Sequence, residues 1–249
     1  MKKISAPLKE FFAGLATLTE FRTARGRRYP ASAVVKLVVV GLLCGQLNVT
    51  AIAQFGKANT RLLWRGLGFR RELLPTRWTI SRVLEGTSVE QLSALFMTWM
   101  SGLVTRLQAG DSARPLTFSV DGKSAKGSKG WGARELMMLN VFAHELELVV
   151  ASWTIADKSG ESPELRRRLA PLCEAFPGLA VLVGDAAYAN RPLAEAIIGM
   201  EHDYLLRIKG NQAELRETLA TTFEEESTRP PDAQESEKKG APWCIANFG

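Results

Sequence analysis

The feature that most constrains the fold of this chain is a change in hydrophobic period near residue 110. Before it, apolar residues recur at helical spacing, as Leu8, Phe11, Phe12 and Leu15 do. From Leu116 onward, short apolar runs of strand length replace that pattern. The chain is therefore expected to be α+β overall, with a helical part that precedes a part built on a sheet.

The first part, residues 1–109, is predicted to be an all-helical domain. The nearly all-apolar run Ala33–Leu47 predicts a buried helix, and at about 15 residues with Lys36 inside it is too short to span a bilayer. Thr87-Ser88-Val89-Glu90 predicts a capping box, with Thr87 as N-cap of the next helix. No membrane association is expected, and Gly110 to Pro115 is interpreted as a linker.

The second part, residues 110–223, is predicted to alternate strands and helices. A β-hairpin turns at His144-Glu145, and helices are expected to begin at Ser162-Pro163, Asn190 and Asn211. The expected strands are Leu116–Val120, Leu136–Phe142, Leu146–Ile155, Leu179–Val183 and Tyr204–Ile208. Three strands followed by helix-connected strands predict a mixed α/β sheet of the RNase H-like kind, covered by helices. Residues 224–249, charged and without apolar period, are predicted to form a mobile tail.

Charge is distributed unevenly between these parts. Residues 1–109 carry 16 Lys or Arg against 5 Asp or Glu, whereas residues 110–249 carry 16 against 21. A basic first part indicates a polyanionic partner such as duplex DNA, although a merely basic surface would show the same count. The densest cluster is Arg22, Arg25, Arg27 and Arg28 in a loop closed by Pro30.

Cysteine and histidine usage excludes several classes of site. Cys44, Cys173 and Cys244 are odd in number and far apart, which argues against a disulfide framework and against a thiolate metal site. His144 and His202 are the only histidines, so a zinc site or a Ser-His-Asp triad would be poorly supplied. Acidic residues are therefore the better candidates for chemistry.

Two aspartates follow predicted strands. Asp121 comes directly after Leu116–Val120, where Asp-Gly is also a common hairpin turn. Asp185 ends the most apolar strand, where α/β sheets place their sites, although a cap or loop acid would fit too. Together the two carboxylates would suit Mg²⁺ and in-line displacement at phosphorus. Lys123 and Lys209 are candidate phosphate contacts, with a solvated loop and a strand-to-helix turn as the alternatives.

The chain resembles the DDE insertion-sequence transposases, in the H-repeat-associated (ISAs-type) branch. The motifs that carry the resemblance occur in order between about residues 5 and 223. They are Gly26-Arg27-Arg28-Tyr29-Pro30, Leu43-Cys44-Gly45, Ile52-Ala53-Gln54-Phe55, Pro75 to Leu84, Val120-Asp121-Gly122-Lys123, Lys158-Ser159-Gly160-Glu161, Gly184-Asp185-Ala186 and Asp203 to Gln212.

The resemblance implies a transposase that cuts insertion-sequence ends and joins them to target DNA, with Mg²⁺ or Mn²⁺ held by catalytic Asp121 and Asp185. It implies that the helical domain binds terminal-repeat and target duplexes, with Arg25, Arg27, Arg28, Arg77 and Arg82 as candidate contacts. A homodimer is compatible with this activity, and a bacterial cytoplasmic location at the nucleoid is expected.

The resemblance departs at the end of the chain. Nothing after Lys239 matches the segment that supplies the third acid of the family, so the catalytic domain is expected to be incomplete, with a truncated or out-of-frame tail. Glu161 is the one upstream acid that could reach the site, as a minor candidate metal ligand. The prediction is DNA binding with impaired strand transfer. The alternatives are a non-catalytic repressor that occupies transposon ends and a stand-alone RNase H-like nuclease.

Overall fold

The computed structural model describes residues 2–24, 27–109, 114–125, 136–155 and 160–226. The chain divides into two compact units, Met1–Arg106 and Leu107–Gly249. The division falls three residues before the boundary expected at residue 109. Each unit is described by itself.

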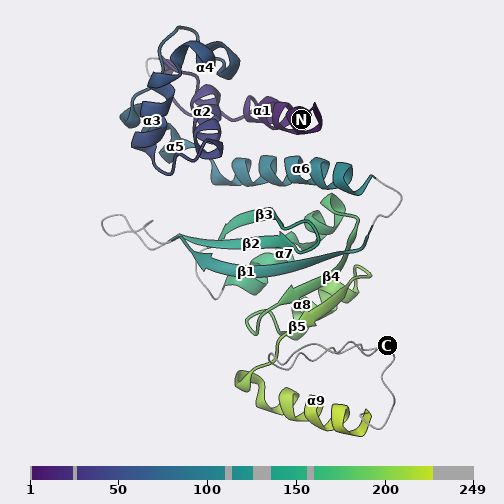
Figure 1. Cartoon of the computed structure of the whole chain (residues 1–249). Coiled ribbons are helices and arrows are strands. Elements are labelled where there is room, and N and C mark those ends of the chain that lie inside the picture. Colours follow the sequence, from purple (N-terminus) through teal and green to yellow (C-terminus); the bar gives the residue numbers. More distant parts are fainter. Residues whose placement is uncertain (1, 25–26, 110–113, 126–135, 156–159, 227–249) are drawn as a thin grey trace. The chain divides into compact units, whose positions relative to one another are not determined.

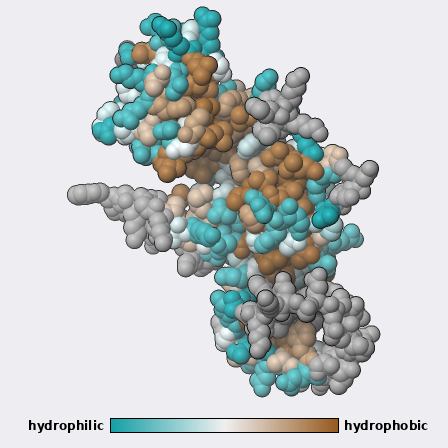
Figure 2. Space-filling view, in the orientation of Figure 1, coloured by the Kyte–Doolittle hydropathy of each residue, from teal (hydrophilic) through white to brown (hydrophobic). Residues whose placement is uncertain are grey.

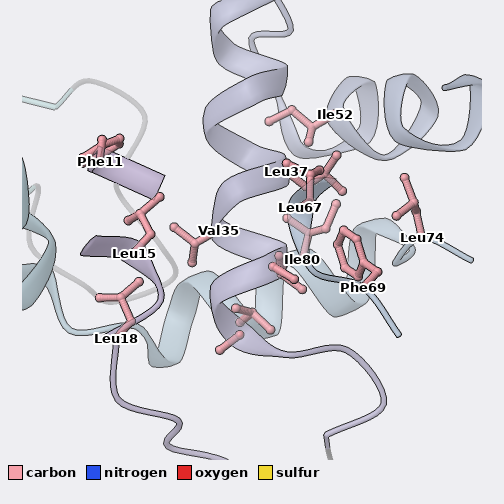
Figure 3. Close-up of a cluster of buried hydrophobic side chains, with 14 residues drawn as sticks. Phe11, Leu15, Leu18, Val35, Leu37, Ile52, Leu67, Phe69, Leu74 and Ile80 are labelled. Carbon is pink, nitrogen blue, oxygen red and sulfur yellow. The ribbon is translucent and has the colours of Figure 1, made fainter. Parts of the chain in front are cut away.

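The first unit consists of helices. They are α1 (Lys2–Leu15), α2 (Ala31–Leu43), α3 (Val49–Ala58), α4 (Thr60–Leu67), α5 (Arg77–Gly86) and α6 (Val89–Gln108), whose last two residues extend past the unit (Figure 1). The central helix is α2, which packs against α1, α3, α4 and α5. Its Val35 and Leu37 lie among Leu15 of α1, Ile52 of α3 and Ile80 of α5 in the buried cluster (Figure 3).

The apolar run after residue 31 is not one helix. α2 ends at Leu43, and Gly45 adopts a φ of 79°, in the left-handed region that glycine tolerates best. Asn48 then caps α3 by accepting a hydrogen bond from the Ala51 amide at 2.9 Å. The expectation of a buried helix through Leu47 is therefore wrong at its end, where the Leu47 side chain is 86% exposed.

The capping box before α6 is shifted by one residue from the expected position. Ser88, rather than Thr87, accepts the hydrogen bond from the Gln91 amide at 3.2 Å. The Thr87 hydroxyl instead donates to the Val83 carbonyl at 2.7 Å, within the last turn of α5. Thr87 thus closes one helix, and Ser88 opens the next.

The second unit is built on a five-stranded mixed sheet. Its strands are β1 (Leu116–Ser124), β2 (Met137–Ala143), β3 (Leu148–Ile155), β4 (Leu179–Gly184) and β5 (Asp203–Leu206), in the order β3-β2-β1-β4-β5. β1–β2 and β2–β3 pair antiparallel, whereas β1–β4 and β4–β5 pair parallel. This topology is RNase H-like, as the order of the predicted strands indicated.

Helices follow the strands as expected: α7 (Glu161–Ala175), α8 (Arg191–Ile198) and α9 (Ala213–Glu226), with a short 3₁₀ turn η3 (Gly210–Gln212) before α9 (Figure 1). The Phe118 ring of β1 packs edge-on against Phe176 at the end of α7, with 5.4 Å between ring centroids. Buried Leu165, Leu169 and Leu172 continue the apolar side of α7. The side of β1 that bears Phe118 is therefore the buried side.

Two of the three expected helix starts differ in detail. α7 begins at Glu161, and the Ser162 hydroxyl accepts a hydrogen bond from Asn190 instead of capping the helix. α9 begins at Ala213, because Asn211 lies inside the 3₁₀ turn. Asn190 is the expected N-cap of α8 and accepts from the Leu193 amide at 3.1 Å.

Candidate functional site

The parallel pairing of β1 with β4 brings the two predicted aspartates together. Val120 pairs with Gly184 in the register of these strands, and Asp121 and Asp185 are the next residues on each chain segment. Neighbouring strands lie about 4.8 Å apart, so the two residues are neighbours at the carboxyl end of β4. Both side chains are exposed.

Asp121 does not occupy a hairpin turn, and it does not follow the strand. β1 continues to Ser124, with Asp121 opposite Asn140 of β2, because β2 keeps pairing with β1 after β4 has ended. An oxygen of the Asp121 carboxylate lies 3.2 Å from the Lys123 Nζ. Lys123 is 72% exposed, so this ion pair contributes little to stability and leaves the lysine accessible.

Asp185 lies in a well-fixed loop between β4 and α8. Its Oδ1 accepts a hydrogen bond from the Ala187 amide at 2.8 Å, and its carbonyl accepts one from the Tyr188 amide at 3.1 Å. The Asn190 side chain donates to the Ser162 hydroxyl at 2.6 Å, which links this loop to the start of α7. The backbone around Asp185 is thereby held in place before any ligand arrives.

Glu161, the minor candidate, is buried at the first residue of α7. It is 6% exposed and is the one charged residue that is buried in the part of the chain that the structure describes. A Cβ added at Gly122 would lie 2.1 Å from the Glu161 Oε1, so the carboxylate packs directly against the backbone of Gly122. The Glu161 carboxylate therefore contacts the residue that follows Asp121 in β1.

Tyr188 was not among the residues expected from the sequence. Its ring is buried, and its hydroxyl interacts with the carboxylate of Glu161. Burial is the largest cause that raises the pKa of Tyr188 above its usual value, followed by the negative charges of Glu161, Asp185 and Asp121. The Tyr188 hydroxyl is therefore neutral, and the charges of all three carboxylates act on it. The only sequence signal was its position three residues after Asp185.

The donor set suits a hard divalent cation, since Asp121 and Asp185 offer carboxylate oxygens from neighbouring strand ends. Across the described ranges, however, no three His, Cys, Asp or Glu side chains are already arranged to hold one ion. The aspartate pair is therefore the part of the site that fits a divalent cation. Water and substrate phosphate would fill the remaining coordination positions, as is usual for Mg²⁺.

Lys209 is exposed at the turn after β5 and lines a groove of about 860 Å³ between β5 and α9. The groove also contains apolar Leu215, Leu219 and Phe223 of α9. The Gln212 side chain donates to the Ala189 carbonyl, which joins this turn to the loop that carries Asp185. No contact of Lys209 with either aspartate is seen in the described residues.

Some arginines of the basic loop in the helical unit form contacts within the loop itself. Arg22 is 14% exposed, pairs with Glu20 at 2.8 Å and donates to the Tyr29 carbonyl at 2.7 Å. Arg27 is exposed but donates through Nε to the Arg22 carbonyl at 2.7 Å, and Arg28 is exposed. Arg25 lies outside the described residues. Arg22 is therefore a structural residue of this loop.

Exposed cations are concentrated instead between α3 and α5. Residues 57–82 contain seven Lys or Arg and one acid, Glu72. All seven are exposed: Lys57, Arg61, Arg65, Arg70, Arg71, Arg77 and Arg82. The Arg77 guanidinium lies 4.3 Å from the ring centroid of Trp78, which is itself 65% exposed. Figure 2 shows hydrophilic residues over the α4 end of this unit.

Most of this segment was not predicted from the sequence, because its basic residues, apart from the adjacent Arg70 and Arg71, are four to six residues apart and do not form a run. Only Arg77 and Arg82 were singled out. We call residues 57–82 the α4–α5 basic segment. Within the described residues, no helix is both long and apolar enough to cross a membrane.

Comparison with known proteins places the chain in a family. Residues 113–243 match the family described as Transposase DDE domain, and residues 12–100 match the one described as DDE_Tnp_1-associated. The first match takes in 131 of the 249 residues. The chain therefore belongs to the DDE transposase family, whose chemistry depends on divalent metal ions.

Individual relatives agree with this assignment. The candidate transposase YncI of Escherichia coli (strain K12) is 26% identical over 202 residues, 79% of this chain and 76% of its own length. The H repeat-associated candidate transposase YbfD of the same strain is 24% identical over 221 residues, 87% of this chain and 82% of its own. The resemblance to H-repeat-associated transposases is thereby confirmed.

A solved structure of the piggyBac transposase synaptic complex with hairpin DNA is similar to 85% of this chain. The TM-score is 0.42, the sequence identity is 12%, and 49% of that chain is covered.

Proposed function

We propose that this chain carries out metal-dependent strand cleavage and strand transfer at the ends of an insertion sequence. The observation that carries the proposal is the parallel register of β1 and β4, which sets Asp121 beside Asp185 in a chain of the DDE family. This work takes place on the chromosome, so we assign the chain to the bacterial cytoplasm, at the nucleoid.

Asp121 and Asp185 are the residues that would hold Mg²⁺ or Mn²⁺. Such ions, when bound, activate the attacking oxygen and stabilise the leaving oxygen in displacement at phosphorus. Asp185 keeps its Oδ1 on the Ala187 amide, which orients Oδ2 as the free donor. The Lys123 Nζ lies 3.2 Å from the Asp121 Oδ2. Lys123 is therefore positioned to neutralise a DNA phosphate beside the two aspartates.

The test is cleavage of duplex DNA that carries the ends flanking the gene for this chain, with Mg²⁺ or Mn²⁺. Asp121→Asn and Asp185→Asn keep side-chain size but replace a negatively charged oxygen ligand with a neutral amide, so they are expected to lower the rate about 100-fold or more. Asp203→Asn, an exposed acid at the start of β5, is the matched control.

Three other outcomes would refute the proposed site or support a different function. Metal-dependent cleavage that survives both aspartate substitutions would refute the site. Tight binding of the ends without any cleavage by the unaltered chain would support a repressor that occupies the ends. Cleavage that ignores the terminal sequence would support a stand-alone nuclease.

We further propose that the helical unit binds the terminal-repeat and target duplexes through the α4–α5 basic segment. Its support is charge: seven exposed cations against one acid over residues 57–82. Arg77 and Arg82 keep the role expected of them, whereas the loop contributes through Arg25, Arg27 and Arg28. A homodimer would supply one copy of the chain to each transposon end.

The salt dependence of DNA affinity tests this surface. Each lost phosphate contact reduces the slope of log K against log salt by about 0.9, so Arg77→Ala with Arg82→Ala should reduce it by almost 2. Arg166→Ala with Arg216→Ala removes two exposed charges from the second unit and serves as the control. An equal change in both double variants would mean that only net charge matters.

A further inference from the structure

A polar row crosses three strands of the sheet at Asp121. Asp121 of β1 pairs directly with Asn140 of β2, and Asn140 pairs with Ser152 of β3. Directly paired residues of neighbouring strands point to the same face of a sheet, with their Cβ atoms about 4.5–5.5 Å apart. Asp121 is exposed and the other two residues are half-buried, so the row lies on the less buried face of these strands.

Asparagine is an unfavourable residue for the interior of a sheet. It is depleted in strands, because its side chain offers the backbone alternative hydrogen bonds. Asn140 nevertheless lies in β2, which has a paired strand on each side. Its neighbours along the strand, Leu139 and Val141, are fully buried on the opposite face. A polar side chain at this position therefore calls for a local explanation.

The Ser152 hydroxyl satisfies one end of the Asn140 amide. The Ser152 Oγ donates a hydrogen bond to the Asn140 Oδ1 at 2.7 Å. The Asn140 Nδ2 makes no hydrogen bond with any residue that the structure describes, and it is accessible to solvent. An amide nitrogen carries two donors. Ser152 therefore orients an amide whose donors are free, in the row that contains Asp121.

Lys123 supplies a second donor on the same face. Its Nζ lies 3.2 Å from the Asp121 Oδ2, and its partner in β2 is Met138, two residues from Asn140. Lys123 and Asn140 are thus diagonal neighbours, a separation that a long side chain can bridge. A cationic and a neutral donor therefore flank Asp121. Both kinds of donor contact phosphate oxygens in protein–DNA interfaces.

We propose that the Asn140 amide, oriented by Ser152, binds a phosphate of the DNA strand that lies beside Asp121. The inference deepens the proposed function and rests on it. Asn140 donates from Nδ2 to a phosphate oxygen, and Lys123 neutralises charge in the same place. Ser152 is a positioning residue that acts through Asn140. Because the amide is neutral, its contact fixes the position of the strand without releasing counterions.

The test measures the affinity of the full chain for duplex DNA that carries the ends flanking its gene, without divalent cations so that no strand is cut. Asn140→Leu keeps the side-chain size but removes the donors. We expect its Kd to rise about tenfold, as for loss of a hydrogen bond to a charged group. The slope of log K against log salt should not change, whereas Lys123→Ala should reduce it by about 0.9.

The matched control is Thr154→Val. Thr154 is a half-buried residue of β3, two positions after Ser152 and on the same face, and valine removes only its hydroxyl. This variant should change neither the Kd nor the salt slope. An equal loss of affinity in Thr154→Val and Asn140→Leu would show that the effect comes from the packing of the sheet, and would overturn the proposal.

Ser152→Ala tests the positioning role. It leaves the donors in place but frees the amide to rotate, so its Kd should rise by less than that of Asn140→Leu. The double variant should bind no more weakly than Asn140→Leu alone. It removes both hydrogen-bonding partners together, so the stability of the second unit in urea should change little. Full additivity of the two losses would show that Ser152 does not act through Asn140.

A methylphosphonate, which replaces one charged phosphate oxygen with a methyl group, locates the contact on the DNA. It is placed at one phosphate at a time around the cleaved bond. At one position it should weaken binding by the unaltered chain, and there Asn140→Leu should cause no further loss. Additive losses at every position would show that Asn140 contacts none of these phosphates, and would overturn the proposal.

The outcomes also separate this inference from the proposed function. If Asn140→Leu binds the ends as tightly as the unaltered chain, while cleavage still depends on Asp121 and Asp185, the role of Asn140 is wrong and the proposed function stands. If the unaltered chain neither binds nor cuts the ends, both are refuted.

Discussion

Replacing Glu20 by Gln should loosen the segment that leads into α2. The Glu20 carboxylate accepts hydrogen bonds from the Arg22 Nε and Nη2, both at 2.8 Å, and from the Ala31 amide at 3.1 Å. The hydrogen bond from Arg22 is the main reason that the pKa of Glu20 falls from 4.5 to about 2. The carboxylate therefore fastens this segment to the first turn of α2.

The size of the effect follows from that pKa. A fall of roughly 2.5 units corresponds to at most about 3.4 kcal/mol, at 1.36 kcal/mol per unit. The Glu20 side chain is 26% exposed, so solvent screening brings the expected value to about 2 kcal/mol. Because the folded pKa is lowered, this stabilisation is present above pH 4.5 and is lost as pH falls toward 2.

The assay is hydrogen–deuterium exchange of α2 peptides in the full chain at increasing urea, with β1 peptides as internal reference. At pH 6, Glu20→Gln should lower the α2 stability by about 2 kcal/mol and leave β1 unchanged. At pH 3 the difference between the two proteins should fall to less than half of its value at pH 6, because the folded pKa of Glu20 is about 2. An unchanged α2 at pH 6, or a difference at pH 3 as large as that at pH 6, would refute the reasoning.

Three further substitutions test local features. Gly184→Ala should destabilise the second unit by about 1–3 kcal/mol in urea denaturation, because its Cβ would meet Tyr188 at 2.9 Å and Leu206 at 3.0 Å in a buried place. Asn190→Ala should cost about 1 kcal/mol or more in the same assay, through loss of the α8 cap. Gly68→Ala should cost about 1 kcal/mol in thermal unfolding, since Gly68 ends α4 at a φ of 91°. A neutral result at any of the three would contradict its local geometry.

The sequence predicted the order of elements well, because hydrophobic period is a local property that each segment carries by itself. The prediction from sequence failed where a local structure depends on a segment elsewhere in the chain. Asp121-Gly122 reads as a turn locally, yet β2 continues to pair with this strand through Ser124. Thr87 and Ser88 are both good N-caps, and only the end of α5 at Gly86 decides between them.

The candidate site was predictable in part for the same reason. The aspartates could be found from strand ends and family motifs. The burial of Glu161 could not, because it depends on the absence of a side chain at Gly122, on a strand 39 residues away along the chain. Arg22 read as a DNA contact by composition, and its pairing with Glu20 and Tyr29 appears only in three dimensions.

The pairing of β1 with β4 also sets the order in which the aspartate pair can form. β1, β2 and β3 are joined by antiparallel neighbours close in sequence, whereas Asp121 and Asp185 are 64 residues apart and meet only when β4 docks. Contacts of long sequence separation carry a larger loop-closure cost and tend to form late. The antiparallel strands are therefore expected to pair before the two aspartates meet. The proposed cation site requires the completed sheet.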